Sequence, residues 1–61
     1  MNIIVKVTFI DNGYAILENA QDISIEDNIL SITEKGDISF TETMRYIKSI
    51  EIKTNPQKIG G

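Results

Sequence analysis

Apolar residues alternate with polar ones in short runs along most of this chain, and turn-forming residues separate the runs. In the first run, Ile3, Val5, Val7 and Phe9 occupy every second position. A period of two places successive side chains on opposite faces of a β-strand. Isoleucine dominates the apolar set, and its stiff, branched side chain suits strands. The predicted strand segments are residues 3–10, 14–18, 23–25, 30–32, 38–41 and 49–53.

Short polar segments predict where the chain reverses. Asn12-Gly13 lies between two strand-like runs, and it predicts a hairpin because both residues tolerate a positive φ. Asp27-Asn28 and Lys35-Gly36-Asp37 predict two further tight turns. Residues 42–46 break the alternation, and the spacing of the apolar side chains there suits a single helical turn.

These elements predict an all-β fold. We expect five or six antiparallel strands in a meander that forms a curled sheet or a small open barrel. Residues 1–53 make one domain, and residues 54–61, with a proline and two terminal glycines, make a flexible tail. The predicted core consists of Val5, Val7, Phe9, Ile16, Ile23, Ile25, Leu30, Ile32, Phe40, Ile47, Ile50 and Ile52.

Residues 24–35 also fit a helix, which would turn the fold into an α+β β-grasp. Ser24 is a suitable N-cap with Asp27 three residues later, the isoleucines of the segment fall on one face, and Gly36 is a suitable stop. Ile, Ser, Thr, Asn and Asp dominate the segment, and all are mediocre helix formers. Propensity therefore favours strands, with the helix as the alternative.

The residue types present restrict the chemistry. The chain has 61 residues and neither cysteine nor histidine. Disulfides, thiolate metal sites and the usual general base are thereby excluded, so we expect a non-enzymatic protein without metal or cofactor. A domain this small buries only about 60% of the surface that its unfolded chain exposes. Self-association is the remaining way to gain stability, and it predicts a homo-oligomer.

Charge and hydropathy restrict the partners. Nine acidic and six basic residues give a net charge of −3, which argues against nucleic-acid binding. No apolar run approaches the roughly 20 residues that span a bilayer. The first ten residues carry Lys6 and lack the pattern of a signal peptide, so we expect a cytoplasmic protein.

Some apolar and aromatic residues are left outside the predicted core. Ile4, Tyr14 and Tyr46, with the basic residues Arg45 and Lys48, form the predicted binding surface. We expect the chain to bind a protein through this surface or through a sheet edge. A further alternative is an oligomer that sequesters a small anionic ligand between subunits.

Two resemblances add to these expectations. The first is carried by Val5-x-Val7-x-Phe9, Asn12-Gly13, Ile23-x-Ile25-Glu26-Asp27, Leu30-x-Ile32 and Ile47-Lys48-Ser49-Ile50-Glu51-Ile52. Over residues 3–53 the chain resembles a loose class of small, uncharacterised β proteins from low-GC Gram-positive bacteria and their phages. The resemblance agrees with the all-β prediction and implies a phage or mobile-element protein, such as a regulator or inhibitor of a host protein. It carries no functional residues across.

The second resemblance concerns the ends of the chain. The opening Met1-Asn2-Ile3-Ile4-Val5-Lys6 and the closing Gly60-Gly61 are similar to those of ubiquitin-like proteins, including the bacterial sulfur carriers. The resemblance implies a carrier whose terminal carboxylate is activated and conjugated. The reacting residue would be Gly61, with Gly60 giving access to a narrow active site. The segment 55–59 departs from the direct run between last strand and glycines that this family shows.

Overall fold

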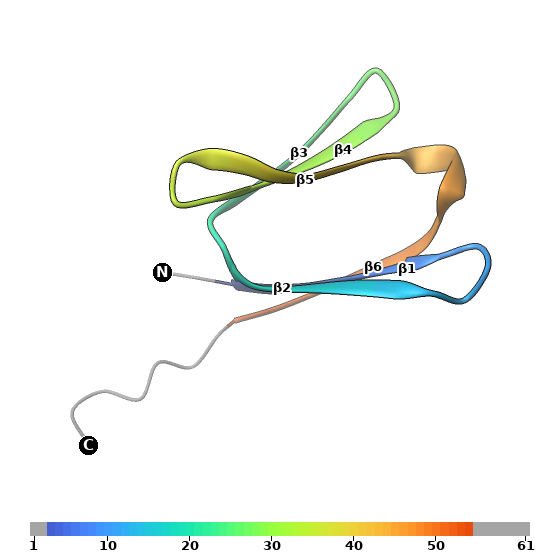
Figure 1. Ribbon diagram of the computed structural model, residues 1–61, viewed down its shortest axis with the longest axis horizontal. Coiled ribbons are helices and arrows are strands. Elements are labelled where there is room, and N and C mark those ends of the chain that lie inside the picture. Colours follow the sequence, from blue (N-terminus) through green and yellow to red (C-terminus); the bar gives the residue numbers. More distant parts are fainter. Residues whose placement is uncertain (1–2, 55–61) are drawn as a thin grey trace.

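The computed structural model of the chain describes residues 3–54, which form two three-stranded antiparallel sheets packed face to face (Figure 1). Sheet A has the strand order β2-β1-β6, and sheet B has the order β3-β4-β5. The elements are β1 (Ile3–Phe9), β2 (Tyr14–Ala20), β3 (Asp22–Glu26), β4 (Ile29–Glu34), β5 (Asp37–Thr43), the 3-10 turn η1 (Met44–Tyr46) and β6 (Ile47–Thr54). The all-β prediction is confirmed, and so is the helical turn.

The preference for strands over a helix at 24–35 is also confirmed, since this segment forms β3, a turn and β4, and the β-grasp alternative does not hold. One finer prediction is wrong. The six strands do not form one meandering sheet, since β2 and β3 are consecutive but belong to different sheets, and β6 pairs with β1. Each sheet has one apolar face that must be covered, and two small sheets achieve this by covering each other.

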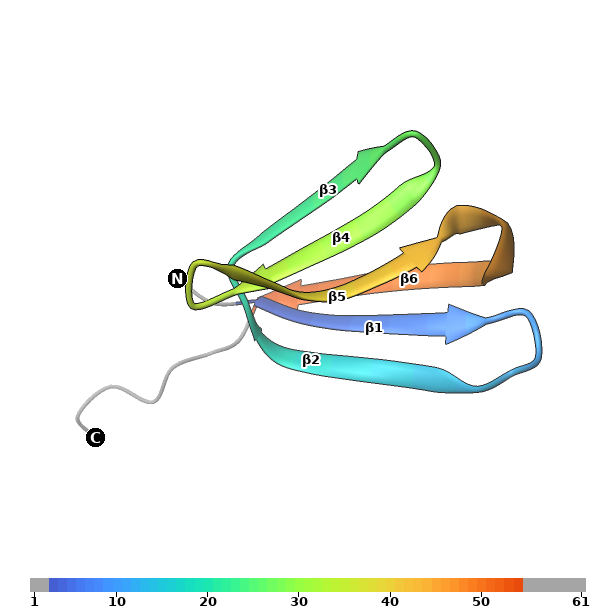
Figure 2. The same cartoon turned by 45° about the horizontal axis from the view of Figure 1, so that its top comes forward.

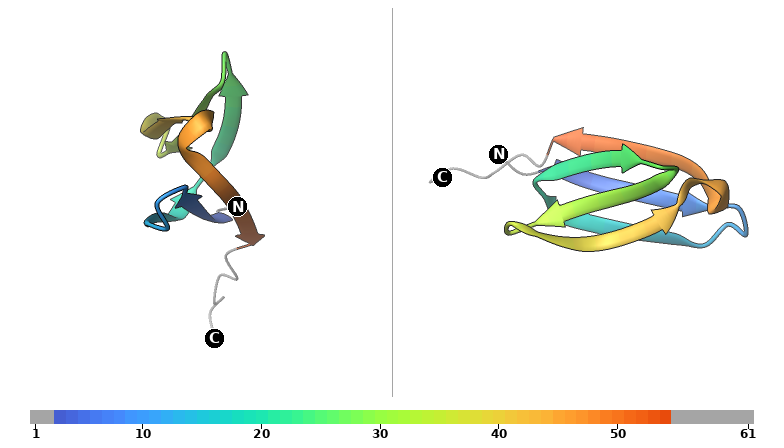
Figure 3. Two further views of the ribbon diagram at one scale, coloured as in Figure 1. Left: turned by 90° about the vertical axis from the view of Figure 1, so that its right-hand side faces the viewer. Right: turned by 90° about the horizontal axis from the view of Figure 1, so that it is seen from above.

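The chain changes sheet at opposite ends of the sandwich (Figures 1 and 2). Gln21 alone separates β2 from β3, and its N–H donates to the carbonyl of Thr33 over 2.8 Å. At the other end, η1 carries the chain from β5 back to β6. In both Figure 1 and Figure 3, β3 lies on the same long edge of the sandwich as β6, and β5 on the same edge as β2. The sheets share no strand pair, so the sandwich is not closed into a barrel.

The core lies between the two central strands. Val5 and Val7 of β1 form one cluster with Leu30 and Ile32 of β4, and with Ala20 these are the fully buried apolar residues among those described. The rings of Phe9 and Phe40 stack at one side with their centroids 6.3 Å apart. The partly buried residues around this centre are Ile3, Phe9, Leu17, Ile23, Phe40, Met44, Ile47 and Ile50.

Three residues of the predicted core are exposed instead. Ile16 is 50% exposed because β2 turns Ala15 and Leu17 inward, opposite Val7 and Val5, and Ile16 therefore faces outward. Ile25 and Ile52 are 53% and 56% exposed for a different reason. They face the other sheet, but they lie on the edge strands β3 and β6, where the opposing sheet no longer covers them.

The predicted turns occur where the sequence placed them. Asp27 and Asn28 both have positive φ, 52° and 64°, as do Lys35 and Gly36 at 53° and 83°. Two consecutive residues of positive φ are typical of the hairpin turn whose twist matches that of its strands.

The first turn has a different geometry from the one predicted. Residues 10–13 connect β1 to β2, and only Asn12, with a φ of 73°, has positive φ. The N–H of Gly13 donates to Oδ1 of Asp11 over 2.9 Å, and the N–H of Phe9 donates to the Gly13 carbonyl over 2.8 Å. The connection is therefore a four-residue loop instead of a two-residue Asn-Gly turn.

The packing of β4 makes two neighbouring residues a matched pair for testing the core. Leu30→Ala removes a fully buried side chain, and we expect it to lower the free energy of unfolding by about 3–5 kcal/mol. Ile29→Ala alters the exposed face of the same strand, and we expect a loss below about 1 kcal/mol. Urea denaturation followed by circular dichroism measures both, and equal losses would contradict this core.

The turn between β4 and β5 offers a stabilising change. Lys35 has a φ of 53°, a conformation that side chains other than Asn, Asp and Gly adopt at a cost. Lys35→Asn creates the Asn-Gly pair that this turn favours, and we expect a gain of about 0.5–1 kcal/mol in the free energy of unfolding. Thermal denaturation checks this, with Lys35→Gln, which loses the same charge at the same position, as the control.

Candidate functional site

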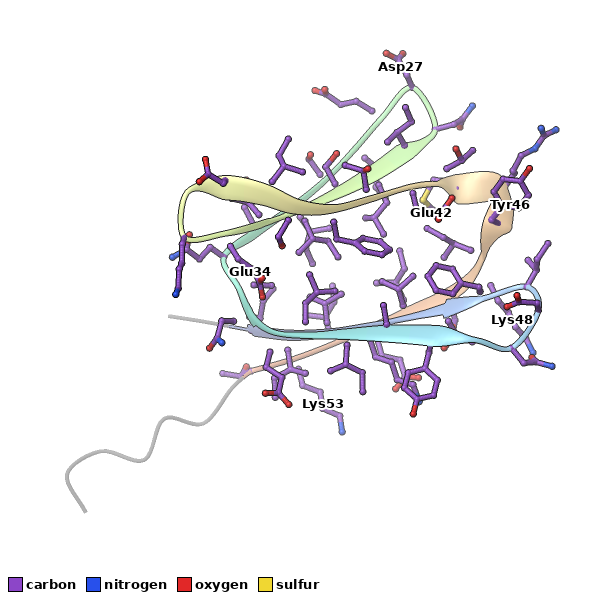
Figure 4. The ribbon with its side chains drawn as sticks, viewed as in Figure 1. Asp27, Glu34, Glu42, Tyr46, Lys48 and Lys53 are labelled. Carbon is purple, nitrogen blue, oxygen red and sulfur yellow. The ribbon has the colours of Figure 1, made fainter. Side chains whose placement is uncertain are left out.

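The side of sheet A that faces away from sheet B gathers apolar and charged side chains. Strand pairing aligns Lys6 of β1 with Ile16 on one side and Glu51 on the other. Figure 4 shows Lys53 on this side, pointing away from sheet B. We call this surface the outer face of sheet A, and its residues are Ile4, Lys6, Thr8, Tyr14, Ile16, Ser49, Glu51 and Lys53.

The outer face of sheet A presents large apolar groups to solvent. Tyr14 is 61% exposed and Ile16 is 50% exposed, and both belong to β2. Next to them is a shallow hollow of about 210 Å³ lined by Ile4, Lys6, Ile16, Glu51 and Lys53. Small-molecule pockets generally measure about 300–1,000 Å³, so a hollow of this size suits one inserted side chain.

Charged residues lie among these apolar residues. The Nζ of Lys6 lies 5.0 Å from the centre of the Tyr14 ring, within the range of a cation–π contact. Glu51 is directly opposite Lys6 across the strand pair, an arrangement that favours opposite charges. Lys6 thus contacts the Tyr14 ring with its ammonium, and an acidic residue occupies the neighbouring cross-strand position.

A second exposed surface lies at the η1 end of the sandwich. The N–H of Ile10 donates to the Tyr46 carbonyl over 2.9 Å, and the N–H of Met44 donates to the Asn28 carbonyl over 2.7 Å. These bonds attach η1 to the β1–β2 loop and to the β3–β4 turn. A hollow of about 430 Å³ lies here, lined by Phe9, Ile10, Asp11, Glu42 and Tyr46; Figure 4 labels the last two.

The predicted binding residues fall in three separate places. Ile4 and Tyr14 share the outer face of sheet A, but Tyr14 lies opposite Thr8, four positions along β1 from Ile4. Tyr46 and Arg45 belong to η1, where Arg45 borders an open hollow of about 660 Å³ beside the β3–β4 turn. Lys48 donates from Nζ to Oδ1 of Asn12 over 3.1 Å, so it braces the first loop. The structure therefore does not join the five residues into one surface.

The predicted binding surface included only Ile4 and Tyr14 of the outer face of sheet A. Ile16 was assigned to the core, and Glu51 was not included, although both share the face of Lys6. The available signal was the period of two: every second residue of a strand lies on the same face, so one residue known to be buried tells which face each of the others lies on. Which of the two faces of a strand is buried depends on where the second sheet packs, so the period of two alone does not determine the buried face.

Within residues 3–54, no group of three or more acidic side chains is arranged so that it could hold a metal ion. The same part of the chain contains no helix long and apolar enough to cross a membrane. Gly60 and Gly61, the residues of the predicted conjugation site, lie outside the described residues.

Comparison with known proteins leaves the surfaces as the basis for inferring function. No protein-family model, no curated protein and no solved structure matches this chain.

Proposed function

We propose that the chain is a non-enzymatic binding protein that docks a protein partner on the outer face of sheet A. The observation that carries the proposal is the exposure of Tyr14 and Ile16 side by side with the hollow around Ile4. A sandwich of this size needs only one apolar face per sheet. Apolar groups gathered on the opposite face are typical of an interaction surface.

The chemistry of the face suits a protein rather than another class of partner. Tyrosine is a common anchor in protein interfaces because it combines a large contact area with a hydroxyl. Lys6, Glu51 and Lys53 surround the apolar residues, which corresponds to an apolar centre with a polar rim. Both signs of charge are present, so a partner with the complementary alternation is favoured over a uniformly anionic ligand.

The outer face of sheet A is a better candidate than the η1 end. Its residues are held by regular strand pairing on both sides of β1, and such a surface needs little ordering when a partner binds. A small docking domain of this kind suits the role of a regulator or inhibitor of a larger protein. That is the role implied by the resemblance to small phage and mobile-element proteins.

A matched pair of substitutions tests the docking face. Ile16→Glu places a charge at its centre, and we expect partner affinity to fall by about 30-fold or more, as for an interface hot spot. Ile38→Glu is the control, since Ile38 is also exposed, at 63%, but belongs to β5 of sheet B. The immobilised chain, incubated with an extract of its source cells, should retain proteins that Ile16→Glu loses and Ile38→Glu keeps.

The retained protein is then used to map the binding site on this chain. Adding it to the isotopically labelled chain should shift the amide NMR signals of β1, β2 and β6 and leave those of β4 unchanged. Circular dichroism of each variant checks that the fold is intact. Retention that is unaffected by Ile16→Glu, or shifts confined to sheet B, would overturn the proposal.

A further inference from the structure

We propose that two copies of this chain pair through β6, antiparallel about a twofold axis, so that their two sheets A become one six-stranded sheet. The inference concerns a sheet edge and does not depend on the proposed docking face. Its occupant is a second copy of the chain, identified by the order of charges along β6.

The β6 strand is available for pairing. It is the last strand in the order β2-β1-β6, and among residues 3–54 no strand lies on its other side. The backbone groups along the free side of an edge strand form a template on which another strand can add.

The sandwich leaves apolar surface uncovered along this edge. Ile52 of β6 and Ile25 of β3 both face the space between the sheets, yet each is more than half exposed. Their strands lie on the same long edge of the molecule (Figure 3). A second sandwich joined at β6 brings its own Ile52 and Ile25 to this place and covers all four side chains.

The charges select one register. In antiparallel pairing of a strand with its own copy, placing Ile52 opposite the partner's Ile52 brings Glu51 opposite the partner's Lys53, and Lys53 opposite the partner's Glu51. Opposite charges facing each other across strands are stabilising. A shift of two residues places Glu51 opposite Glu51 or Lys53 opposite Lys53. A shift of one residue would place the outward-facing side chains of one strand beside the inward-facing side chains of the other. Such a register is excluded because residues opposite each other in paired strands share one face of the sheet.

The other edge strands lack this complementarity. β2, β3 and β5 carry acidic residues and no basic ones, whereas β6 carries both signs. In β3, pairing centred on Ser24 places Asp22 opposite the partner's Glu26, which is a repulsive pair. Of the four edges, β6 is therefore the one whose own sequence is complementary to itself.

A cysteine cross-link tests the twofold axis directly. The chain has no native cysteine, so Ile52→Cys provides one thiol per copy. Residues directly opposite in antiparallel strands have Cα atoms about 4.5–5.5 Å apart, which is within reach of a disulfide. On mild oxidation we expect a covalent dimer to form at least tenfold faster than with Ser24→Cys, an exposed position on the outer side of edge strand β3.

Charge exchange tests the register. Residue 53 lies opposite Ile4 within its own sheet, so Lys53→Glu leaves Lys6 opposite Glu51 across β1 and β6. It converts both intermolecular pairs to repulsion, and we expect the dimer dissociation constant in native mass spectrometry or sedimentation to rise about tenfold or more. Glu51→Lys should act in the same way, with its fold checked by circular dichroism because residue 51 faces Lys6. Mixing the two variants restores complementarity and should yield the mixed dimer.

Three results would overturn the proposal: a wild-type chain that sediments as a monomer at millimolar concentration, cross-linking of Ile52→Cys no faster than that of Ser24→Cys, or variants that do not associate when mixed. Ile16→Glu, which tests the docking face, should dimerise like the wild type because Ile16 belongs to β2. Loss of partner binding without loss of the dimer, or the reverse, therefore separates the two proposals.

Discussion

The packing of β1 against β4 is the interaction on which the rest of this structure depends. Val5 and Val7 meet Leu30 and Ile32 there, and these four side chains are fully buried. Three strands alone are barely stable in water without an apolar face that something covers. β1 also holds both of its neighbours in sheet A, as β4 does in sheet B, so the two central strands carry the pairing as well as the core.

The small size of the sandwich explains its surfaces. Each sheet has three strands, one central and two at the edges. Only the central strand of each sheet has a neighbouring strand on both sides. Some inward isoleucines at the edges therefore remain exposed, as at Ile25 and Ile52, although Ile23 and Ile50 of the same strands pack against the core. The exposed edge and the apolar outer face of sheet A meet at β6, whose outward side chains contribute Glu51 and Lys53 to both.

The two proposals are consistent with one assembly. Pairing through β6 places the outer faces of two sheets A in one continuous surface, on the same side of a six-stranded sheet. Such a dimer presents the Tyr14 and Ile16 docking residues twice. A partner with two suitably spaced sites, or two linked partners, would then bind more tightly than one face alone allows.

The sequence by itself determined the strands and most of the turns. Alternation located all six strands, and Asp27-Asn28 and Lys35-Gly36 produced turns with the expected positive φ, because these are properties of neighbouring residues. It also placed Ile4 and Tyr14 outside the core.

Only the tertiary structure decided which strands pair, which face of β2 is buried, and that Tyr14 and Tyr46 lie on different surfaces. The physical reason is that a period of two is the same for either face and for any partner strand. Contacts between residues far apart in the chain, such as Val7 with Ala15 and Ile50, select among these equivalent arrangements. The exposure of Ile25 and Ile52 follows from the same cause, since a strand's own residues do not reveal whether it lies at an edge.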